Sequence, residues 1–296
     1  MTEKLTQCPL CSSGHFINYQ TIKDFSVSKE DFLLCKCNSC TLIFTNPRPD
    51  KESIGKYYEF EDYISHQDQA NNLINSLYKL VRRITLKQKI KWINTIHRGK
   101  GNLLDYGCGT GYFLKAASED GWNVKGIEPN KQARNIAQQF QLDVSANLSG
   151  INSDSKFDII TLFHVLEHIH NLKEISLSLR DKLNPNGTLL IAVPNKDSWD
   201  ANKYQTDWAA WDVPRHLYHF NQMTMKTLAK MLDMQIISSI PMKFDSYYVS
   251  LLSEKHQEKR GIKALFSGFI NGLKSNYWAK NNQDNYSSIL FILKKK

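Results

Sequence analysis

The sequence has no long apolar run, and this absence limits where the protein can act. None of its apolar stretches approaches the roughly 20 residues that a membrane-spanning helix needs. The N-terminus, MTEKLTQCPLC, also lacks the apolar core of a secretory signal peptide. We therefore expect a cytoplasmic protein, and its 296 residues suffice for one full core and a small accessory module.

Cysteines are scarce after the first 40 residues. Five of the six lie between Cys8 and Cys40, and only Cys108 lies beyond, which argues against a disulfide framework and suits a reducing compartment. Four of the five form two CxxC pairs, made by Cys8, Cys11, Cys37 and Cys40. Paired thiolates at this spacing predict a tetrahedral zinc site with no open position, which makes the zinc structural. Cys35 is an alternative to Cys37, but only Cys37 forms a CxxC pair with Cys40.

The segment around these cysteines has too few apolar residues to fold alone. Metal binding would supply the missing free energy, on the order of 10 kcal/mol for such sites. We expect a zinc ribbon over residues 1–49, which ends in the sequence LIFTNPRP. Pro47 and Pro49 would end its last strand.

Acidic residues are absent from the stretch between residues 70 and 100, which carries eight lysines and arginines. Its apolar residues recur at helical spacing, so residues 50–100 are predicted to be a helical linker or lid. A basic amphipathic helix can lie on an anionic membrane or on nucleic acid. More often its apolar face packs on the protein and its lysines face solvent, which is the interpretation we favour. The net charge of +9 allows the same alternatives.

Glycines recur at alternate positions in one stretch, LLDYGCGTGYFL at residues 103–114. The apolar run ends at Asp105, and the amphipathic segment that begins at Tyr112 follows the glycines, which predicts strand, tight turn and helix. Gly107, Gly109 and Gly111 allow positive φ and carry no Cβ. A ligand can therefore lie against the backbone at the helix N-terminus.

A second acidic residue, Glu128, ends the next predicted strand, residues 123–127. Ligands of parallel α/β sheets lie at the carboxyl ends of the strands, so we expect Asp105 and Glu128 to face one crevice. A carboxylate there can accept both hydroxyls of a ribose. The glycine pattern is GxGxG, shorter than the GxGxxG dinucleotide fingerprint.

The DYGCGTG motif followed by GIEPN resembles motif I and the acidic second strand of class I S-adenosylmethionine-dependent methyltransferases. The resemblance covers residues 101–195. It implies an α/β fold with a Rossmann-like, mostly parallel seven-stranded sheet, here over residues 101–296, and S-adenosylmethionine as cofactor. The cofactor-binding residues that it implies are Asp105, Tyr106, Gly107, Cys108, Gly109, Gly111, Glu128, Asn147, Phe163 and His164.

The histidines of HVLEHIH follow the buried run FDIITLF. In the family, the residues that leave this strand lie beside the methionine portion of the cofactor. Beyond Glu167, no thiolate or carboxylate supports these histidines as metal ligands, so we expect no metal site there. His168 is expected to be structural.

Two catalytic motifs are missing. Some amino-group methyltransferases carry an Asn/Asp-Pro-Pro-aromatic tetrad after the fourth strand, and it is absent here. Cytosine methylation needs a nucleophilic cysteine near the same place, and the only cysteine beyond the ribbon is Cys108, in the glycine loop. The FTNPRP and PRHLYHF strings instead resemble those of bacterial methyltransferases of sugars and surface glycans.

Aromatic and hydrogen-bonding residues alternate in WDANKYQTDWAAWDVPRHLYHF, residues 199–220. Such a segment suits a sugar or a planar ring and is predicted to be a pocket wall. Its predicted substrate contacts are Arg215, Trp211 and Tyr218. His219 is the predicted base, with His216 as the alternative, because an extended segment directs them to opposite faces.

The remaining chain is predicted to form strands at residues 235–240, 245–253 and 287–294. Between the last two, apolar residues from Ile262 to Tyr277 follow helical spacing among lysines. This C-terminal helical insertion could cap a pocket or touch a membrane.

Together these observations predict methyl transfer from S-adenosylmethionine to a small-molecule acceptor, a sugar or a glycan precursor. The first alternative is an RNA methyltransferase that uses the ribbon and the basic helix, although we do not expect nucleic acid as a partner. The second is a cofactor-binding protein without turnover. A peripheral contact with an anionic membrane is compatible with either helical segment.

Overall fold

The computed structural model describes residues 1–58, 73–259 and 261–296. The chain forms two compact units. The first unit comprises residues 1–60, 164–176 and 192–291, and the second comprises residues 61–163, 177–191 and 292–296. Each unit is made of segments from several parts of the sequence. This division differs in kind from the three consecutive domains, and those domains stay a prediction. Residues 59–72 of the predicted linker lie outside the described residues.

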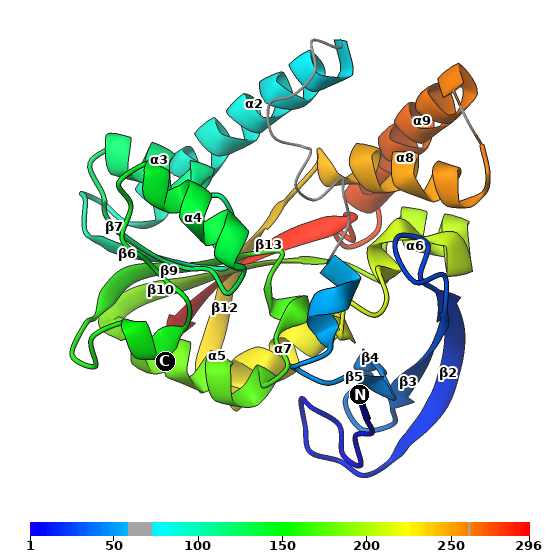
Figure 1. Ribbon diagram of the computed structural model, residues 1–296, viewed down its shortest axis with the longest axis horizontal. Helices are drawn as coiled ribbons and strands as arrows, with labels where there is room; N and C mark the ends of the chain where they lie inside the picture. The colour runs from blue at the N-terminus through cyan, green and yellow to red at the C-terminus, as the bar shows by residue number, and fades with distance from the viewer. Residues whose placement is uncertain (59–72, 260) are drawn as a thin grey trace. The chain divides into compact units, whose positions relative to one another are not determined.

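A seven-stranded sheet confirms the predicted Rossmann-like α/β class (Figure 1). Its strands, in spatial order, are β12 (Met234–Pro241), β13 (Ser288–Lys295), β10 (Leu183–Pro194), β9 (Phe157–Phe163), β6 (Asn102–Tyr106), β7 (Asn123–Ile127) and β8 (Val144–Ser145). Strand β6 runs parallel to both β7 and β9, and β7 runs parallel to β8. The carboxyl ends of β6 and β7 therefore lie at the same edge of the sheet, as the sequence predicts.

Helices of the second unit pack closely against these strands. They are α3 (Tyr112–Glu119) and α4 (Lys131–Gln139), and α2 (Leu73–Ile96) packs against α3. Helix α5 (Leu172–Asp181) joins β9 to β10 along the chain. Gly126 of β7 shows how close α3 lies, because a Cβ there would be 2.6 Å from Leu114 Cδ1. The same Cβ would be 2.8 Å from Cys108 Sγ, so only glycine fits at this position.

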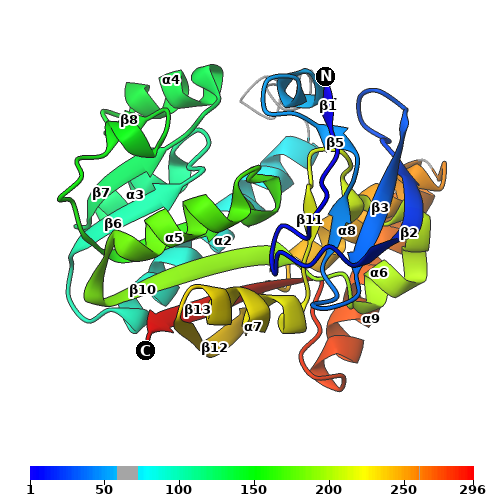
Figure 2. The same ribbon diagram turned by 90° about the horizontal axis from the view of Figure 1, so that it is seen from below.

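The N-terminal strands of the first unit form two small sheets. One pairs β1 (Thr2–Glu3) with β5 (Arg48–Pro49). The other contains β2 (Phe16–Lys23), β3 (Asp31–Cys37), β4 (Ile43–Thr45) and β11 (Tyr218–His219) (Figure 2). In the second sheet Ile43 lies opposite His219, and Phe44 lies opposite Tyr218. A strand from late in the chain therefore completes the sheet that the cysteine segment begins.

The aromatic segment is largely core, and its role as the wall of an acceptor pocket stays a prediction. It folds as α6 (Trp199–Tyr204) and the short 3₁₀ helices η4 (Gln205–Asp207) and η5 (Ala209–Trp211). Trp208, Tyr204 and Trp211 are buried in one apolar cluster that also holds residues of β2, β3 and β4. The polar tips of the rings find buried partners, since Trp208 Nε1 donates to Asp200 at 2.8 Å and Tyr204 Oη donates to Glu254 at 2.8 Å.

The predicted strand at residues 245–253 is wrong, because this segment is helical. It lies in α8 (Asp245–His256), which follows α7 (Gln222–Met231) and β12 and packs against α9 (Gly261–Lys280). Ser246, Ser250 and Ser253 recur at helical spacing and are buried. Their small side chains let α9 approach so closely that a Cβ on Gly268 would lie 2.8 Å from Leu251 Cα. The predicted helical insertion is α9, and no helix among the described residues is long and apolar enough to span a membrane.

Candidate functional site

The glycine turn after β6 has the conformation that the sequence predicts. The φ angles of Gly107, Gly109 and Gly111 are 77°, 54° and 80°, all in the left-handed region that favours glycine. Among the described residues, no heavy atom beyond the chain neighbours of Gly109 lies within 4 Å of the position that a Cβ on Gly109 would occupy, whereas a Cβ on Gly111 would lie 2.8 Å from Ala137 Cβ. Gly111 therefore serves packing, and Gly109 leaves backbone open to a ligand.

Glu128 closes the turn at the end of β7. Its Oε2 accepts the Gly109 N–H and its Oε1 accepts the Asn130 N–H, both at 2.8 Å. The side chain is buried, and this burial raises the pKa of Glu128. Each carboxylate oxygen keeps a second lone pair, so Glu128 can hold the turn and still accept two ligand hydroxyls.

Asp105 is held by a residue that sequence reasoning missed. Its Oδ1 accepts a hydrogen bond of 2.6 Å from Thr161 Oγ1 of the neighbouring strand β9. Burial raises the pKa of Asp105 to about 6, and the nearby charge of Glu128 acts in the same direction. The signal was present, since Thr161 is the one hydroxyl residue in the apolar run FDIITLF.

Helix α2 contributes cations to the same region of the second unit. Lys89 Nζ lies 3.8 Å from the centroid of the Phe163 ring, and the Arg82 guanidinium lies 4.0 Å from that of Tyr112. Both contacts are cation–π interactions. The positive charge of Lys89 also lowers the pKa of Asp105, against the larger effect of burial. The helix predicted as a linker is thus part of the candidate cofactor site.

The other predicted cofactor residues have varied surroundings. Burial raises the pKa of Tyr106 to about 12 and raises that of the Cys108 thiol, so both stay protonated near neutral pH. Asn147 is exposed, and its Oδ1 accepts the Ser149 N–H at 3.1 Å as a cap of η2 (Leu148–Gly150). The role of Asn147 toward an adenine stays a prediction.

Four of the N-terminal cysteines come together in the first unit. The Sγ atoms all lie within 4.8 Å of one another in the group formed by Cys8, Cys11, Cys37 and Cys40. The Sγ atoms of Cys8 and Cys40 are 3.5 Å apart, close to the roughly 3.8 Å expected between thiolates on one tetrahedral zinc ion. Cys35 lies outside this cluster, with its Sγ 3.8 Å from Asn18 Oδ1.

A second cluster, the histidine cluster, lies in the first unit and consists of His164, Glu167, His168, His216, His219 and Asp245. His164 has a φ of 58°, and its ring lies between two carboxylates. Its Nε2 is 2.9 Å from Asp245 Oδ2, and its Nδ1 is 3.6 Å from Glu167 Oε1. Burial lowers the pKa of His164, but the two carboxylates outweigh burial and raise it to about 10. Sequence reasoning missed Asp245 because it placed that residue in a strand.

His168 and His216 are fixed by backbone carbonyls. His168 Nδ1 lies 2.9 Å from Arg215 O, and His216 Nδ1 lies 2.9 Å from Ala210 O. A carbonyl can only accept, so each Nδ1 carries a proton. Burial lowers the pKa of His168 to about 4, which keeps its ring neutral at pH 7.

The predicted base, His219, is buried beside His216. The two ring centroids are 6.5 Å apart, although the sequence predicted that they point to opposite faces. The difference arises because β11 begins only at Tyr218, so His216 lies outside the extended segment. Among the described residues, His219 Nε2 has no hydrogen-bond partner. Burial lowers the pKa of His219 well below its usual value, so the ring is neutral.

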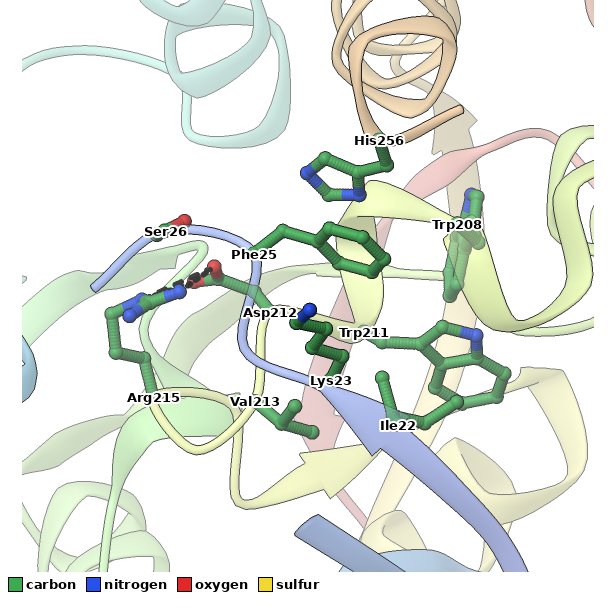
Figure 3. Close-up of a pocket in the computed structure, with 10 residues that line it drawn as sticks. All are labelled: Ile22, Lys23, Phe25, Ser26, Trp208, Trp211, Asp212, Val213, Arg215 and His256. Carbon is green, nitrogen blue, oxygen red and sulfur yellow. Dashed lines mark hydrogen bonds and ion pairs between the residues drawn. The ribbon is translucent and has the colours of Figure 1, made fainter. Parts of the chain in front are cut away.

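The predicted substrate residues have structural partners. The Arg215 guanidinium lies 2.6 Å from Asp212 Oδ1, as Figure 3 shows, and it donates to the backbone oxygen of Tyr57 at 3.1 Å. Trp211 Nε1 donates to Gln205 O at 2.6 Å, and Tyr218 Oη donates to His170 O at 2.8 Å. Their role toward an acceptor stays a prediction. Because these polar groups already have partners within the protein, the structure does not favour that role.

The pocket drawn in Figure 3 is small. It lies between β2, the aromatic segment and α8, and the empty space among its lining side chains is about 190 Å³ even with the adjoining open solvent included. Phe25 and His256 stack across it with their ring centroids 4.1 Å apart. Ligand sites usually enclose roughly 300 to 1,000 Å³, so this hollow is too small for an acceptor.

The chain matches known methyltransferases. The family described as methyltransferase domain matches over residues 78–239, more than half of the chain. Among curated proteins it is similar to the ubiquinone biosynthesis O-methyltransferase of Rickettsia akari, with 23% identity over 154 residues, covering 50% of this chain and 61% of that protein. The corresponding protein of Rickettsia prowazekii is 26% identical over 150 residues, covering 48% and 60%. The chain thus spans less than two thirds of these relatives.

Solved structures share the fold at low identity. The magnesium protoporphyrin IX methyltransferase of Synechocystis PCC 6803, solved with bound SAH, aligns with a TM-score of 0.54 and 12% identity. The alignment covers 83% of this chain and all of that one. The same protein with bound SAM aligns with a TM-score of 0.52 and 14% identity, covering 85% of this chain.

Proposed function

The chain belongs to the methyltransferase domain family, and from this premise we propose that it transfers the methyl group of S-adenosylmethionine to an oxygen of a small-molecule acceptor. The glycine turn between Asp105 and Glu128 is the observation that carries the proposal. Glu128 holds the turn and keeps lone pairs for the ribose hydroxyls. The open backbone at Gly109 leaves room for the ligand.

The proposed reaction is an in-line displacement. The acceptor oxygen forms a bond to the methyl carbon while the carbon–sulfur bond breaks, and the sulfonium becomes a neutral thioether. The hydroxyl proton must leave, and we assign it to His219, whose neutral ring has an unpartnered Nε2. General base catalysis of this kind contributes about 10²- to 10⁴-fold.

Two acceptor classes follow from different observations. The sequence resemblance favours a sugar or glycan precursor, but the burial of Trp208 and Trp211 does not favour the predicted aromatic pocket wall. The names of the curated relatives instead suggest a ubiquinone precursor. Incubating the purified protein with methyl-labelled S-adenosylmethionine and each acceptor class would decide between them by mass spectrometry.

We predict that His219→Gln lowers the turnover number about 10²-fold or more and leaves the affinity for S-adenosylmethionine unchanged. Glutamine keeps similar bulk but cannot accept a proton near neutral pH. Steady-state kinetics with the acceptor found above, together with calorimetry of cofactor binding, would measure both quantities.

His170→Gln is the matched control. His170 lies in the same unit, and its Nε2 is bound to Pro49 O at 3.1 Å, so we expect normal turnover. Normal turnover in the His219 variant would remove His219 from the mechanism. A fall in melting temperature with unchanged turnover would make it a purely structural residue.

The rival functions are less well supported. Arg82 and Lys89 of the basic helix contact aromatic rings of their own unit, which leaves fewer cations for an RNA backbone. RNA binding that weakens steeply with salt would favour that rival. A protein that binds S-adenosylmethionine but methylates neither acceptor class would favour the non-catalytic alternative.

We also propose that α9 rests on an anionic lipid surface. Its large apolar side chains occupy roughly a third of the helix circumference and are exposed, at Ile262, Leu265, Phe266, Phe269, Leu273 and Tyr277. The opposite face is made of small residues that pack on α8. Lys263 and Lys274 flank the apolar face, and the helix has no acidic residue. This arrangement is typical of helices in the membrane interface.

We predict that the double variant Phe266→Ser, Phe269→Ser loses binding to vesicles that contain anionic lipid. The wild-type protein should sediment with these vesicles and much less with neutral ones, because both apolar burial and lysine charge contribute. Met223→Ser is the control, since Met223 is an exposed apolar residue on α7. Equal sedimentation of all three proteins would exclude this surface.

A further inference from the structure

A carboxylate and two imidazoles meet inside the histidine cluster. One ligand atom from each of Glu167, His168 and His216 lies within 4.8 Å of the other two. Glu167 and His168 belong to the 3₁₀ helix η3 (Leu166–His168), and His216 lies just before β11. We propose that these three side chains bind one divalent transition-metal ion of the zinc class. The sequence predicted no metal site here because His216 is far from Glu167 along the chain.

The two histidines present the nitrogen that a metal needs. Each Nδ1 donates to a backbone carbonyl, of Arg215 for His168 and of Ala210 for His216. The Nε2 atoms are therefore the atoms that the two rings can offer to a metal. Ligating histidines typically donate their other N–H to a carbonyl or carboxylate, which fixes tautomer and ring orientation. Tyr58 Oη, 2.9 Å from His168 Nδ1, adds a further restraint.

Glu167 presents a carboxylate that lacks a hydrogen-bond partner. Its side chain is only 1% exposed, and neither Oε1 nor Oε2 finds a donor among the described residues. Burying such a group without a partner costs several kcal/mol, so nearly all buried polar groups are paired. Bonds to a cation would remove this cost. The backbone of Glu167 is held as well, because its carbonyl accepts the Leu217 N–H at 2.7 Å.

The neighbouring charges satisfy Glu167 only in part, through an ion pair with His164. His164 Nδ1 is 3.6 Å from Oε1, too far for a hydrogen bond, and His164 Nε2 is 2.9 Å from Asp245. Asp212 Oδ2 is 3.8 Å from His216 Nε2, but Asp212 also pairs with the Arg215 guanidinium. The cluster thus brings a buried carboxylate and two imidazoles together, with His164 as the nearest cationic side chain.

Two histidines and one glutamate form a donor set that leaves a coordination position open. Zinc with three protein ligands keeps a fourth position for water or substrate, and such a site polarises the oxygen bound there. Assistance to an acceptor hydroxyl would be its role, and this part alone rests on the proposed function. The metal site itself does not.

The test measures metal content of the full chain, without an acceptor. After loading with Co²⁺ and removal of excess ion, we expect two ions per chain, one on the cysteines and one in this site. Glu167→Gln and His216→Gln should each retain one ion. His170→Gln, which alters a neighbouring histidine outside the ligand set, should retain two.

Spectra separate the two sites. Cobalt on thiolates gives intense sulfur-to-metal charge-transfer bands, whereas cobalt on imidazole and carboxylate does not. The difference spectrum between wild type and His216→Gln should therefore lack those bands. Two ions in both ligand variants, or one ion in the wild type, would overturn the proposal. Melting curves identify a misfolded variant. The number of ions bound by the wild-type protein tests the metal site without any variant and without a measurement of methyl transfer.

Discussion

Replacing Cys37 with serine should remove the zinc ion that we propose for the four clustered cysteines and unfold the N-terminal sheet. Structural zinc sites supply apparent binding free energies of about 10 to 16 kcal/mol, more than a typical domain's whole stability. Cys37 ends β3, β3 pairs with β4, and β4 pairs with β11. Because β11 carries His219, we also expect methyl transfer to fall. Elemental analysis, circular dichroism and melting temperature would measure the loss.

Cys35→Ser is the matched control for this prediction. Cys35 lies on the same strand, but its sulfur is near Asn18 and the carbonyl of Asn46 and not in the cluster. The variant should keep its zinc and melt near the wild-type temperature. If Cys35→Ser lost its zinc while Cys37→Ser kept it, the ligand would be Cys35 and not Cys37.

Replacing Glu128 with alanine should weaken S-adenosylmethionine binding about 5- to 150-fold. The substitution removes the acceptor for two backbone N–H groups and for the ribose hydroxyls. Unpaired buried groups cost about 1 to 3 kcal/mol, and 1.4 kcal/mol corresponds to tenfold in affinity. Isothermal titration calorimetry with S-adenosylmethionine would measure the change.

Glu119→Ala controls for the loss of a negative charge in the same unit. Glu119 ends α3, and its side chain is exposed with a 3.9 Å ion pair to Lys115, which contributes little. Its loss should leave the affinity unchanged. Equal affinity in the Glu128 variant and in wild type would refute the role of Glu128.

The glycine turn and the cysteine pairs were predictable because their signals are local. Gly107, Gly109 and Gly111 adopt positive φ within one turn, and an acidic residue after each parallel strand lies at one edge of the sheet by topology alone. Two CxxC pairs already constrain how their sulfurs can meet. Short-range geometry therefore determined the candidate cofactor site and the cysteine cluster.

The aromatic segment and α8 show where local signals fail. An alternation of aromatic and polar residues fits a pocket wall and a core equally well, and buried partners such as Asp200 and Glu254 decided for the core. The sequence of α8 is rich in residues that suit strands. Its buried serines, packed against the glycines of α9, made a helix the better solution.

What the sequence determined by itself is the class of fold, the cofactor turn and the cysteine cluster, since each depends on residues close together along the chain. Only the tertiary structure decided the histidine cluster. His216 reaches Glu167 and His168 from a distant part of the chain, where the Leu217 N–H also donates to the Glu167 carbonyl at 2.7 Å. Pairing at such separation is set by packing of the whole unit, and no local pattern encodes it.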